Sequence, residues 1–210
     1  CVCVCVCLPV MHEGLVFKLA TDPKIEGRYL YGGETADLSL AAKGARGELH
    51  GSNSFFQFFL EKEIPIQVPL QTVIDYRGFR LVAMPVFPIQ RGQTLVYGSE
   101  DAGATVRNSD SKFEEWMAQA ARRFSLARHN VHGKMLYTGG DVEGHRVLDE
   151  DGKNQYYMID LARWAPPEDP RETGHLGYKS SSVFFRLLRP EFLQSLATMS
   201  GGGGGGGGGG

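Results

Sequence analysis

Two aspartates, Asp141 and Asp160, have the residue type and placement best suited to chemistry in this sequence. Asp141 follows a predicted helix, and Asp160 comes directly after a strongly apolar run. A carboxylate in a loop can orient or deprotonate a hydroxyl group, and a carboxylate at a strand end can bind Mg²⁺. Together these roles make up the chemistry of phosphoryl transfer, in which Glu143 or His145 could assist.

The order of predicted elements around these aspartates is similar to that of protein-kinase-like folds, with a hinge strand, a helix, a catalytic-loop Asp and a metal-binding Asp. There is no clear Gly-x-Gly-x-x-Gly loop, no Val-Ala-Ile-Lys strand, and no Asn in the usual place after the candidate catalytic Asp. Lys43, in a glycine-rich segment read as a loop, is a possible phosphate contact. We assign no catalytic residue and no cofactor, and keep a kinase-like nucleotide-binding domain or pseudokinase, with ATP and Mg²⁺, as the alternative.

Two groups of charged residues are candidate binding residues. Asp75 and Arg77 are neighbours at a predicted turn, with Arg80 just beyond it; Asp can cap such a turn and Arg can pair with a carboxylate, so a structural role is favoured. Asp160 and Arg163 follow an apolar Tyr-Tyr-Met-Ile run, and charges at the end of a buried strand need partners. They are either a structural ion pair or the most functional place in the chain.

No metal site is predicted. The four cysteines alternate with valine at the start of the chain, a spacing that a translated dinucleotide repeat also produces, and no cysteine follows. The histidines considered as ligands lack the i, i+4 helical spacing of zinc proteases. They are His50, His129, His132, His145 and His175. A serine nucleophile is also excluded, because Gly-x-Ser-x-Gly does not occur around Ser52 or Ser99.

Composition points away from a general attraction to nucleic acid or membranes. The 210 residues carry a formal net charge of −2, so any RNA contact must be local. The arginines that could form a local RNA-binding patch are Arg77, Arg80, Arg91 and Arg107. No stretch approaches the roughly 18 apolar residues that span a bilayer, and the start of the chain lacks the charged segment of a signal peptide. We therefore expect no membrane insertion and a cytoplasmic location.

Strand and helix signals are mixed without a regular βαβ alternation, which predicts a single α+β domain of antiparallel hairpins packed with helices. Short strands and turns are expected over 15–40, and the class of 55–60 stays open. Hairpins are predicted at 70–87 and at 144–161, and the second strand of the first is apolar enough to be covered on both faces. Ser111 and Glu114 have capping-box spacing at the start of a helix. A helical pattern over 183–196 restarts at Pro190.

The two ends are of low complexity. Residues 1–10 are dominated by the Cys-Val run, and residues 201–210 are all glycine, which has no side chain to bury and loses the most backbone entropy on ordering. We expect neither end to be part of the fold. The predicted domain covers residues 11–200.

Four blocks of sequence stand out between these ends. The first is Val68-Pro69-Leu70 with Ile74-Asp75-Tyr76-Arg77-Gly78-Phe79-Arg80, and the second is Leu95-Val96-Tyr97-Gly98-Ser99 with Asp101, Gly103 and Thr105-Val106. The third runs from Glu143-Gly144-His145 through Asp151-Gly152, Tyr156-Tyr157 and Asp160-Leu161-Ala162-Arg163 to Pro166-Pro167-Glu168, and the last is Leu187-Leu188-Arg189-Pro190-Glu191-Phe192. In type and order they resemble the Clu domain of the clustered mitochondria family, over residues 50–195. The charged residues of these blocks that we assign to binding are Asp75, Arg77, Arg80, Glu143, His145, Asp160 and Arg163.

The resemblance implies a cytosolic, non-enzymatic interaction module with protein partners that acts in the distribution of mitochondria. Members of the family are also associated with messenger RNAs for mitochondrial proteins. Full-length members are much longer and carry a tetratricopeptide array, whereas no repeat of about 34 residues occurs here. Roles that depend on that array are therefore not expected of this chain.

Overall fold

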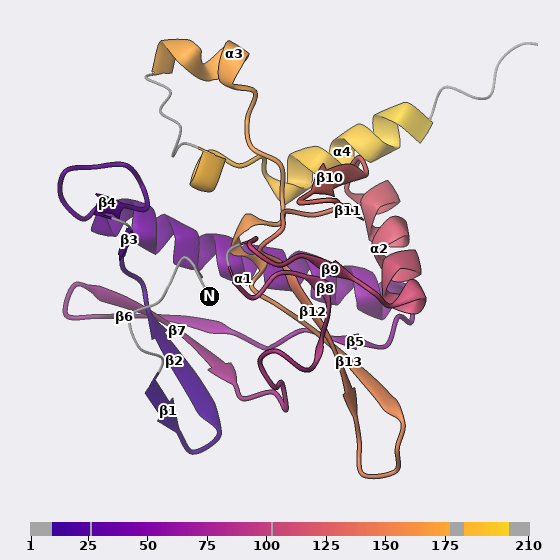
Figure 1. Ribbon diagram of the computed structural model, residues 1–210. Coiled ribbons are helices and arrows are strands. Elements are labelled where there is room, and N and C mark those ends of the chain that lie inside the picture. The colour runs from indigo at the N-terminus through magenta and orange to yellow at the C-terminus, as the bar shows by residue number, and fades with distance from the viewer. Residues whose placement is uncertain (1–9, 26, 102, 177–182, 202–210) are drawn as a thin grey trace, which may run out of the picture.

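The computed structural model describes residues 10–25, 27–101, 103–176 and 183–201. The predictions for the Cys-Val run at 1–9 and for the glycine tail from 202 onward lie outside these residues. The described chain is α+β, with helices packed on mainly antiparallel sheets, as predicted (Figure 1). The kinase-like order of elements is not confirmed.

The first sheet has four antiparallel strands in the order β1-β2-β7-β6. Their bounds are Val10–His12 for β1, Leu15–Leu19 for β2, Thr72–Tyr76 for β6 and Phe79–Pro85 for β7. The predicted hairpin at 70–87 is thus confirmed, with a two-residue turn at Arg77 and Gly78. Both turn residues have positive φ, +49° and +81°, which is the type I′ pattern that matches the twist of the strands.

The second sheet has five strands in the order β5-β13-β12-β8-β9, and only the β5–β13 pair is parallel. The bounds are Ile66–Gln67 (β5), Leu95–Gly98 (β8), Arg107–Asn108 (β9), Glu143–Leu148 (β12) and Asn154–Ile159 (β13). The predicted second hairpin is therefore confirmed. Two small ribbons complete the strands: Lys24–Ile25 (β3) with Arg28–Tyr29 (β4), and His129–Val131 (β10) with Lys134–Leu136 (β11).

The longest helix, α1 at Leu38–Glu61, was not predicted. Its glycines obscure the pattern, because glycine disfavours helix by about 1 kcal/mol relative to alanine. The reading of Lys43 as a loop residue is wrong, since it lies inside α1. One glycine has a packing reason: a Cβ at Gly51 would lie 2.3 Å from the carbonyl oxygen of Leu161. The helix therefore packs closely on the 3₁₀ turn η1, Leu161–Arg163.

The other helices follow the sequence signals more closely. The predicted helix over Ser111–Arg123 is confirmed as α2, but its N-cap is Asp110, whose Oδ1 accepts a hydrogen bond from the Phe113 amide at 3.0 Å. The capping-box prediction was therefore wrong by one residue. A helix begins at Pro190, as expected, whereas no α-helix occurs over 183–189. The remaining elements are α3 (Pro170–Thr173), η2 (Gly174–Leu176) and α4 (Pro190–Gly201).

Two hydrophobic cores share α1. The first half of the helix contributes Ala41 and Ala45 to a core with β7 of the first sheet. The second half contributes Phe55 and Phe59 to a larger core with α2 and the second sheet. In Figure 1 the helix runs across the whole width of the molecule, past both sheets. The middle of α1 is therefore the junction at which the two cores meet.

Candidate functional site

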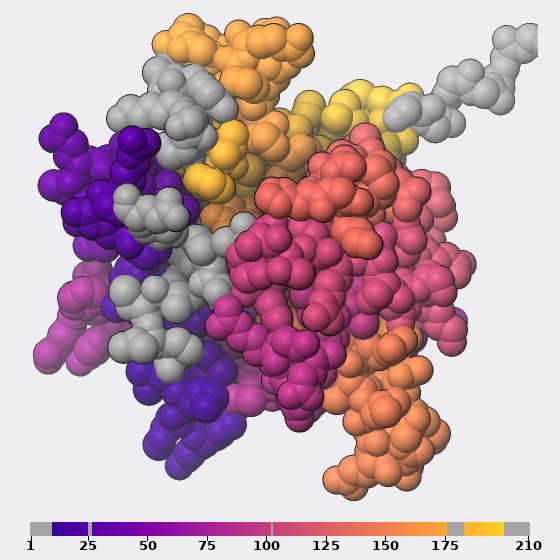
Figure 2. Space-filling view, in the orientation of Figure 1, coloured from indigo at the N-terminus to yellow at the C-terminus, as the bar shows by residue number. Residues whose placement is uncertain are grey.

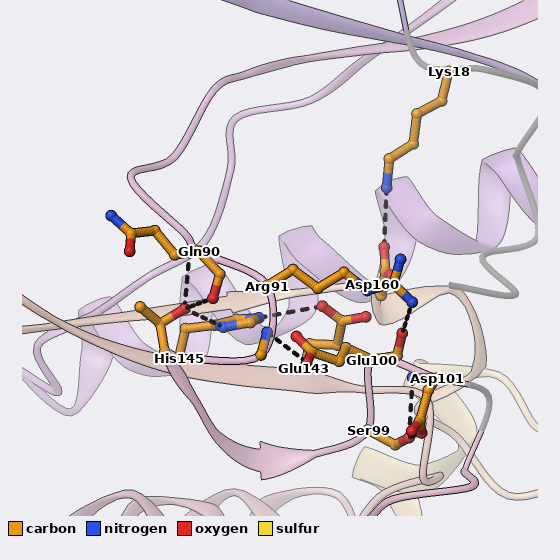
Figure 3. Close-up of polar contacts among 11 residues, drawn as sticks. Lys18, Gln90, Arg91, Ser99, Glu100, Asp101, Glu143, His145 and Asp160 are labelled. Carbon is orange, nitrogen blue, oxygen red and sulfur yellow. Dashed lines mark hydrogen bonds and ion pairs between the residues drawn. The ribbon is translucent and has the colours of Figure 1, made fainter.

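Asp160 lies at this junction. It follows β13 directly, its φ of +58° is in the left-handed region, and its side chain is only 6% exposed. Lys18, from β2 of the other sheet, donates a hydrogen bond from Nζ to Asp160 Oδ1 at 3.0 Å, and its side chain is 14% exposed. Figure 3 shows the lysine extending down to the aspartate. An ion pair this deeply buried joins the two sheets and costs both charges most of their hydration.

Glu48 approaches the same place from the middle of α1. It is buried, and its Oε1 accepts hydrogen bonds from the Leu161 amide and from Nε2 of Gln71, both at 3.1 Å. Burial raises the pKa of Glu48, and the negative charge of Asp160 raises it further. Glu48 therefore links the helix to the turn after Asp160, and the raised pKa of its carboxyl favours the uncharged form there.

Glu143 and His145 supply the third side of the site from β12. Nε2 of His145 lies 3.2 Å from Oε2 of Glu143, and its Nδ1 lies 3.1 Å from Oγ1 of Thr94. Burial raises the pKa of Glu143 to about 9, helped by the charge of Asp160 and a hydrogen bond with its carboxylate. Burial also lowers the pKa of the fully buried His145 to about 4. At neutral pH Glu143 therefore holds a proton and His145 is uncharged.

We call Lys18, Glu48, Glu143 and Asp160 the carboxyl cluster. With Glu143 protonated and Glu48 shifted the same way, the lysine and Asp160 balance each other, which is how a buried group of three carboxyls avoids a large charge penalty. Within the described residues, no group of three or more His, Cys, Asp or Glu side chains is arranged to hold a metal ion. This arrangement lets Glu143 retain a proton, and its Lys18–Asp160 ion pair joins the two sheets.

Asp141, the other aspartate considered for catalysis, forms an ion pair with Nε of Arg163. Arg163 is buried and also stacks over the ring of Phe184, with 5.1 Å between guanidinium carbon and ring centre. Because Arg163 is in the turn that follows Asp160, both candidate aspartates lie around η1. Each of them is paired with a basic side chain from elsewhere in the chain.

The remaining predicted binding residues lie on hairpin β6–β7 of the first sheet. Arg80 donates two hydrogen bonds of 2.7 Å to the Asp75 carboxylate directly across the hairpin, and a third to the Ala42 carbonyl in α1. This bidentate contact lowers the pKa of Asp75. Arg77 instead lies over the Tyr76 ring at 5.3 Å. Asp75 therefore pairs with Arg80 across the hairpin.

The four arginines considered for RNA binding fall into two groups. Arg77 and Arg80 lie on hairpin β6–β7, whereas Arg107 is on β9 of the second sheet and donates to the carbonyls of Leu95 and Gly92. Arg91 lies in the loop before β8 and donates to the Glu100 carbonyl.

Two members of the carboxyl cluster, Lys18 and Glu48, were missed in the sequence. Lys18 is the one charged residue of β2 and lies in register with Val82 and Val73 on the covered face of the sheet. A single lysine in an otherwise apolar strand is a detectable sign of a buried partner. Glu48 gave no comparable signal because α1 itself was not recognised.

The protein is therefore an α+β domain in which a buried carboxyl cluster lies at the junction of two sheets. The family model described as "Clustered mitochondria" matches residues 10–169. A clustered mitochondria protein homolog of Anopheles gambiae is 28% identical over 203 residues, covering 87% of this chain and 13% of the relative. Protein clueless of Drosophila virilis is 34% identical over 163 residues, covering 74% of this chain and 10% of the relative. The chain therefore belongs to the clustered mitochondria family.

This chain spans about a tenth of the length of these relatives. No solved structure matches it significantly. Among the helices that the structure describes, none is both long and apolar enough to cross a membrane.

Proposed function

We propose that this domain is a non-enzymatic interaction module that acts in the cytoplasm, in the distribution of mitochondria within the cell. Membership of the clustered mitochondria family supports the cellular role. The observation that carries the non-enzymatic part is the Lys18–Asp160 ion pair, because the carboxylate with the most suitable position for metal chemistry already has a buried cationic partner. Glu143 beside it holds a proton at neutral pH, and a protonated carboxyl is a poor ligand for Mg²⁺.

The cellular role is tested by removing the domain from the full-length protein that contains it. In cells that lack this protein, we expect the intact protein to restore normal mitochondrial distribution, and a version without residues 10–169 to leave mitochondria clustered. The measurement is the spread of labelled mitochondria around the nucleus, at matched protein abundance. Normal distribution with the deleted version would contradict the proposal.

A nucleotide-binding domain is the alternative, and one observation favours it: Asp141 and Asp160 both lie around η1, as a phosphate and Mg²⁺ site would require. Under our proposal, adding ATP and Mg²⁺ leaves the melting temperature unchanged. A ligand at 100 times its Kd would instead stabilise the native state by about 2.7 kcal/mol. A rise in melting temperature that disappears in Asp160→Asn would establish the alternative.

Association with messenger RNA is a finer part of the family's proposed role. The arginines considered for it lie on different sheets, Arg80 on β7 of the first and Arg107 on β9 of the second, so they give it little support. Protein partners are the better supported class for this domain.

A further inference from the structure

Exposed apolar side chains alone do not define a binding site on this domain. Tyr76 and Phe79 of hairpin β6–β7 are 61% and 56% exposed and lie directly opposite each other. The prediction that the second strand of this hairpin is covered on both faces is therefore wrong at its start. Nothing in the structure shows what would cover these two rings. A cavity beside α2, at the other end of α1, gives more information, because its lining residues define its chemistry.

This cavity is open to solvent, has a volume of about 420 Å³ and lies between helices α2 and α4. Figure 2 shows α4, in yellow, at the upper right of the molecule, whereas the first sheet lies at the lower left. Cavities of this size are typical of binding sites, and in protein complexes a large side chain inserted into such a pocket often carries much of the binding energy.

Three alanines keep the cavity open. Ala118 and Ala121 lie three residues apart and therefore on one face of α2, and Ala197 lines the same cavity from α4. Leu193, one turn before Ala197, is only 1% exposed and belongs to the large core. Core packing thus holds α4 in place, and the small side chains beside the core leave a space that a larger apolar side chain would fill.

The rest of the apolar lining comes from Leu126 and from the ring of Tyr137, both packed against the large core. The Tyr137 amide donates a hydrogen bond of 2.9 Å to the hydroxyl oxygen of Tyr97, which fixes the backbone at this position. The Arg128 guanidinium lies over the Tyr137 ring, at 5.9 Å from its centre. An aromatic occupant suits this lining, because a ring gains from contact with another ring in addition to its burial.

Every polar side chain that lines the cavity can donate a hydrogen bond, and none of them is a carboxylate. These side chains are Arg122, Ser125 and Tyr137. A guanidinium and two hydroxyl groups around an apolar space complement an occupant that carries a carboxylate next to an apolar group.

Arg122 is the cation of this set. It lies four residues after Ala118, on the same face of α2, and its side chain is exposed. Among the described residues no carboxylate forms an ion pair with it, whereas the adjacent Arg123 pairs with Glu61. Glu114, one turn before Ala118, is paired with Arg128. The charge of Arg122 is therefore available to a partner.

We propose that the cavity between α2 and α4 binds an aromatic side chain of a partner protein, next to an acidic residue of the same segment. The ring packs between Ala121, Ala197 and the Tyr137 ring, and the adjacent carboxylate pairs with Arg122. This rests on the proposed function, for which it specifies the chemistry of the partner.

The test uses the purified 210-residue chain and the peptide Gly-Gly-Phe-Asp-Gly-Gly with both ends blocked. We expect saturable amide NMR shifts at the residues that line the cavity, with a Kd on the order of 1 mM, because a single anchoring residue is presented. Peptides in which Phe is replaced by Ala, or Asp by Lys, should bind at least about tenfold more weakly, since they lack the ring or reverse the charge.

Two variants of the protein test the site itself. Arg122→Gln should weaken binding of the Phe-Asp peptide about tenfold, because it removes the only charge that lines the cavity. Arg123→Gln, at the adjacent arginine that does not line the cavity, is the matched control and should bind like the unchanged chain. Ala197→Phe places a ring in the cavity from α4 and should abolish binding.

Several results would overturn the proposal. They are equal binding of the Phe-Asp and Phe-Lys peptides, and equal loss of binding in Arg122→Gln and Arg123→Gln. Phenylacetate that binds at least about tenfold more tightly than the peptide would assign the cavity to small aromatic acids instead. Oligouridine that causes the same Arg122-dependent shifts more strongly than the peptide would assign it to RNA.

The failure of this inference can be distinguished from the failure of the proposed function. If the Phe-Asp peptide does not bind but deletion of residues 10–169 still leaves mitochondria clustered, the inference fails and the proposed function stands. If the peptide binds in an Arg122-dependent way but the deleted version restores normal distribution, the cavity stands as a binding site and the proposed function fails.

Discussion

Replacing Lys18 with methionine is expected to lower the free energy of unfolding by about 3 to 5 kcal/mol, the usual cost of removing one partner from a buried ion pair. Methionine keeps much of the length of the side chain but leaves Asp160 with an uncompensated charge next to Glu48 and Glu143. The burial of both partners distinguishes this pair from a surface ion pair, which contributes little. Urea unfolding followed by circular dichroism measures the loss.

Two controls make this prediction specific. The double variant Lys18→Met with Asp160→Asn removes both charges and should recover most of the lost stability, because the penalty arises from the unpaired charge. Lys153→Met, at an exposed pair whose Nζ is 4.0 Å from Asp151 Oδ2, should change stability by less than about 1 kcal/mol. If Lys18→Met and Lys153→Met were equally stable, the carboxyl cluster would not join the two sheets as described.

The parts of the fold that sequence could predict are those whose signals are local. The hairpins at 72–85 and 143–159 have turn residues between apolar runs, and the proline at position 190 marks the start of α4. Helix α1 was missed because its glycines lower helix propensity, although one of them, Gly51, is required for close packing on η1. That requirement comes from residues more than 100 positions away, so it cannot be seen locally.

Only some residues of the candidate site could be named from the sequence. Asp160 was singled out because it follows an apolar strand, whereas Glu143 and His145 were chosen from the order of elements and from the family-like block that contains them. Their partners Lys18 and Glu48 come from other elements, and only the packing of β2 and α1 brings them to the site. Asp75 was expected to cap its own turn, whereas the strand register places Arg80 directly opposite it.

The second large effect is expected in the pH dependence of stability. Folding raises the pKa of Glu143 from 4.5 to about 9, so between these values the folded state binds a proton that the unfolded state has lost. Stability must therefore fall as pH rises through this range, by up to about 1.4 kcal/mol per pH unit for one proton. The shift of Glu48 has the same sign. His145 acts in the opposite direction, but only between pH 4 and 6.5, because its folded pKa is lowered to about 4.

Above pH 6.5 the carboxyl cluster therefore dominates, and unfolding measured from pH 6.5 to 9 should show falling stability. Glu143→Gln cannot ionise and keeps the size and a hydrogen-bond donor of the protonated acid, so the variant should lose the part of this slope that Glu143 contributes and exceed the unchanged chain in stability at pH 9. Glu150→Gln, at the exposed hairpin turn, should retain the slope. Parallel pH profiles for Glu143→Gln and the unchanged chain would mean that Glu143 is ionised when folded. Lys18 would then lie near two buried negative charges, those of Asp160 and Glu143, and could balance only one of them.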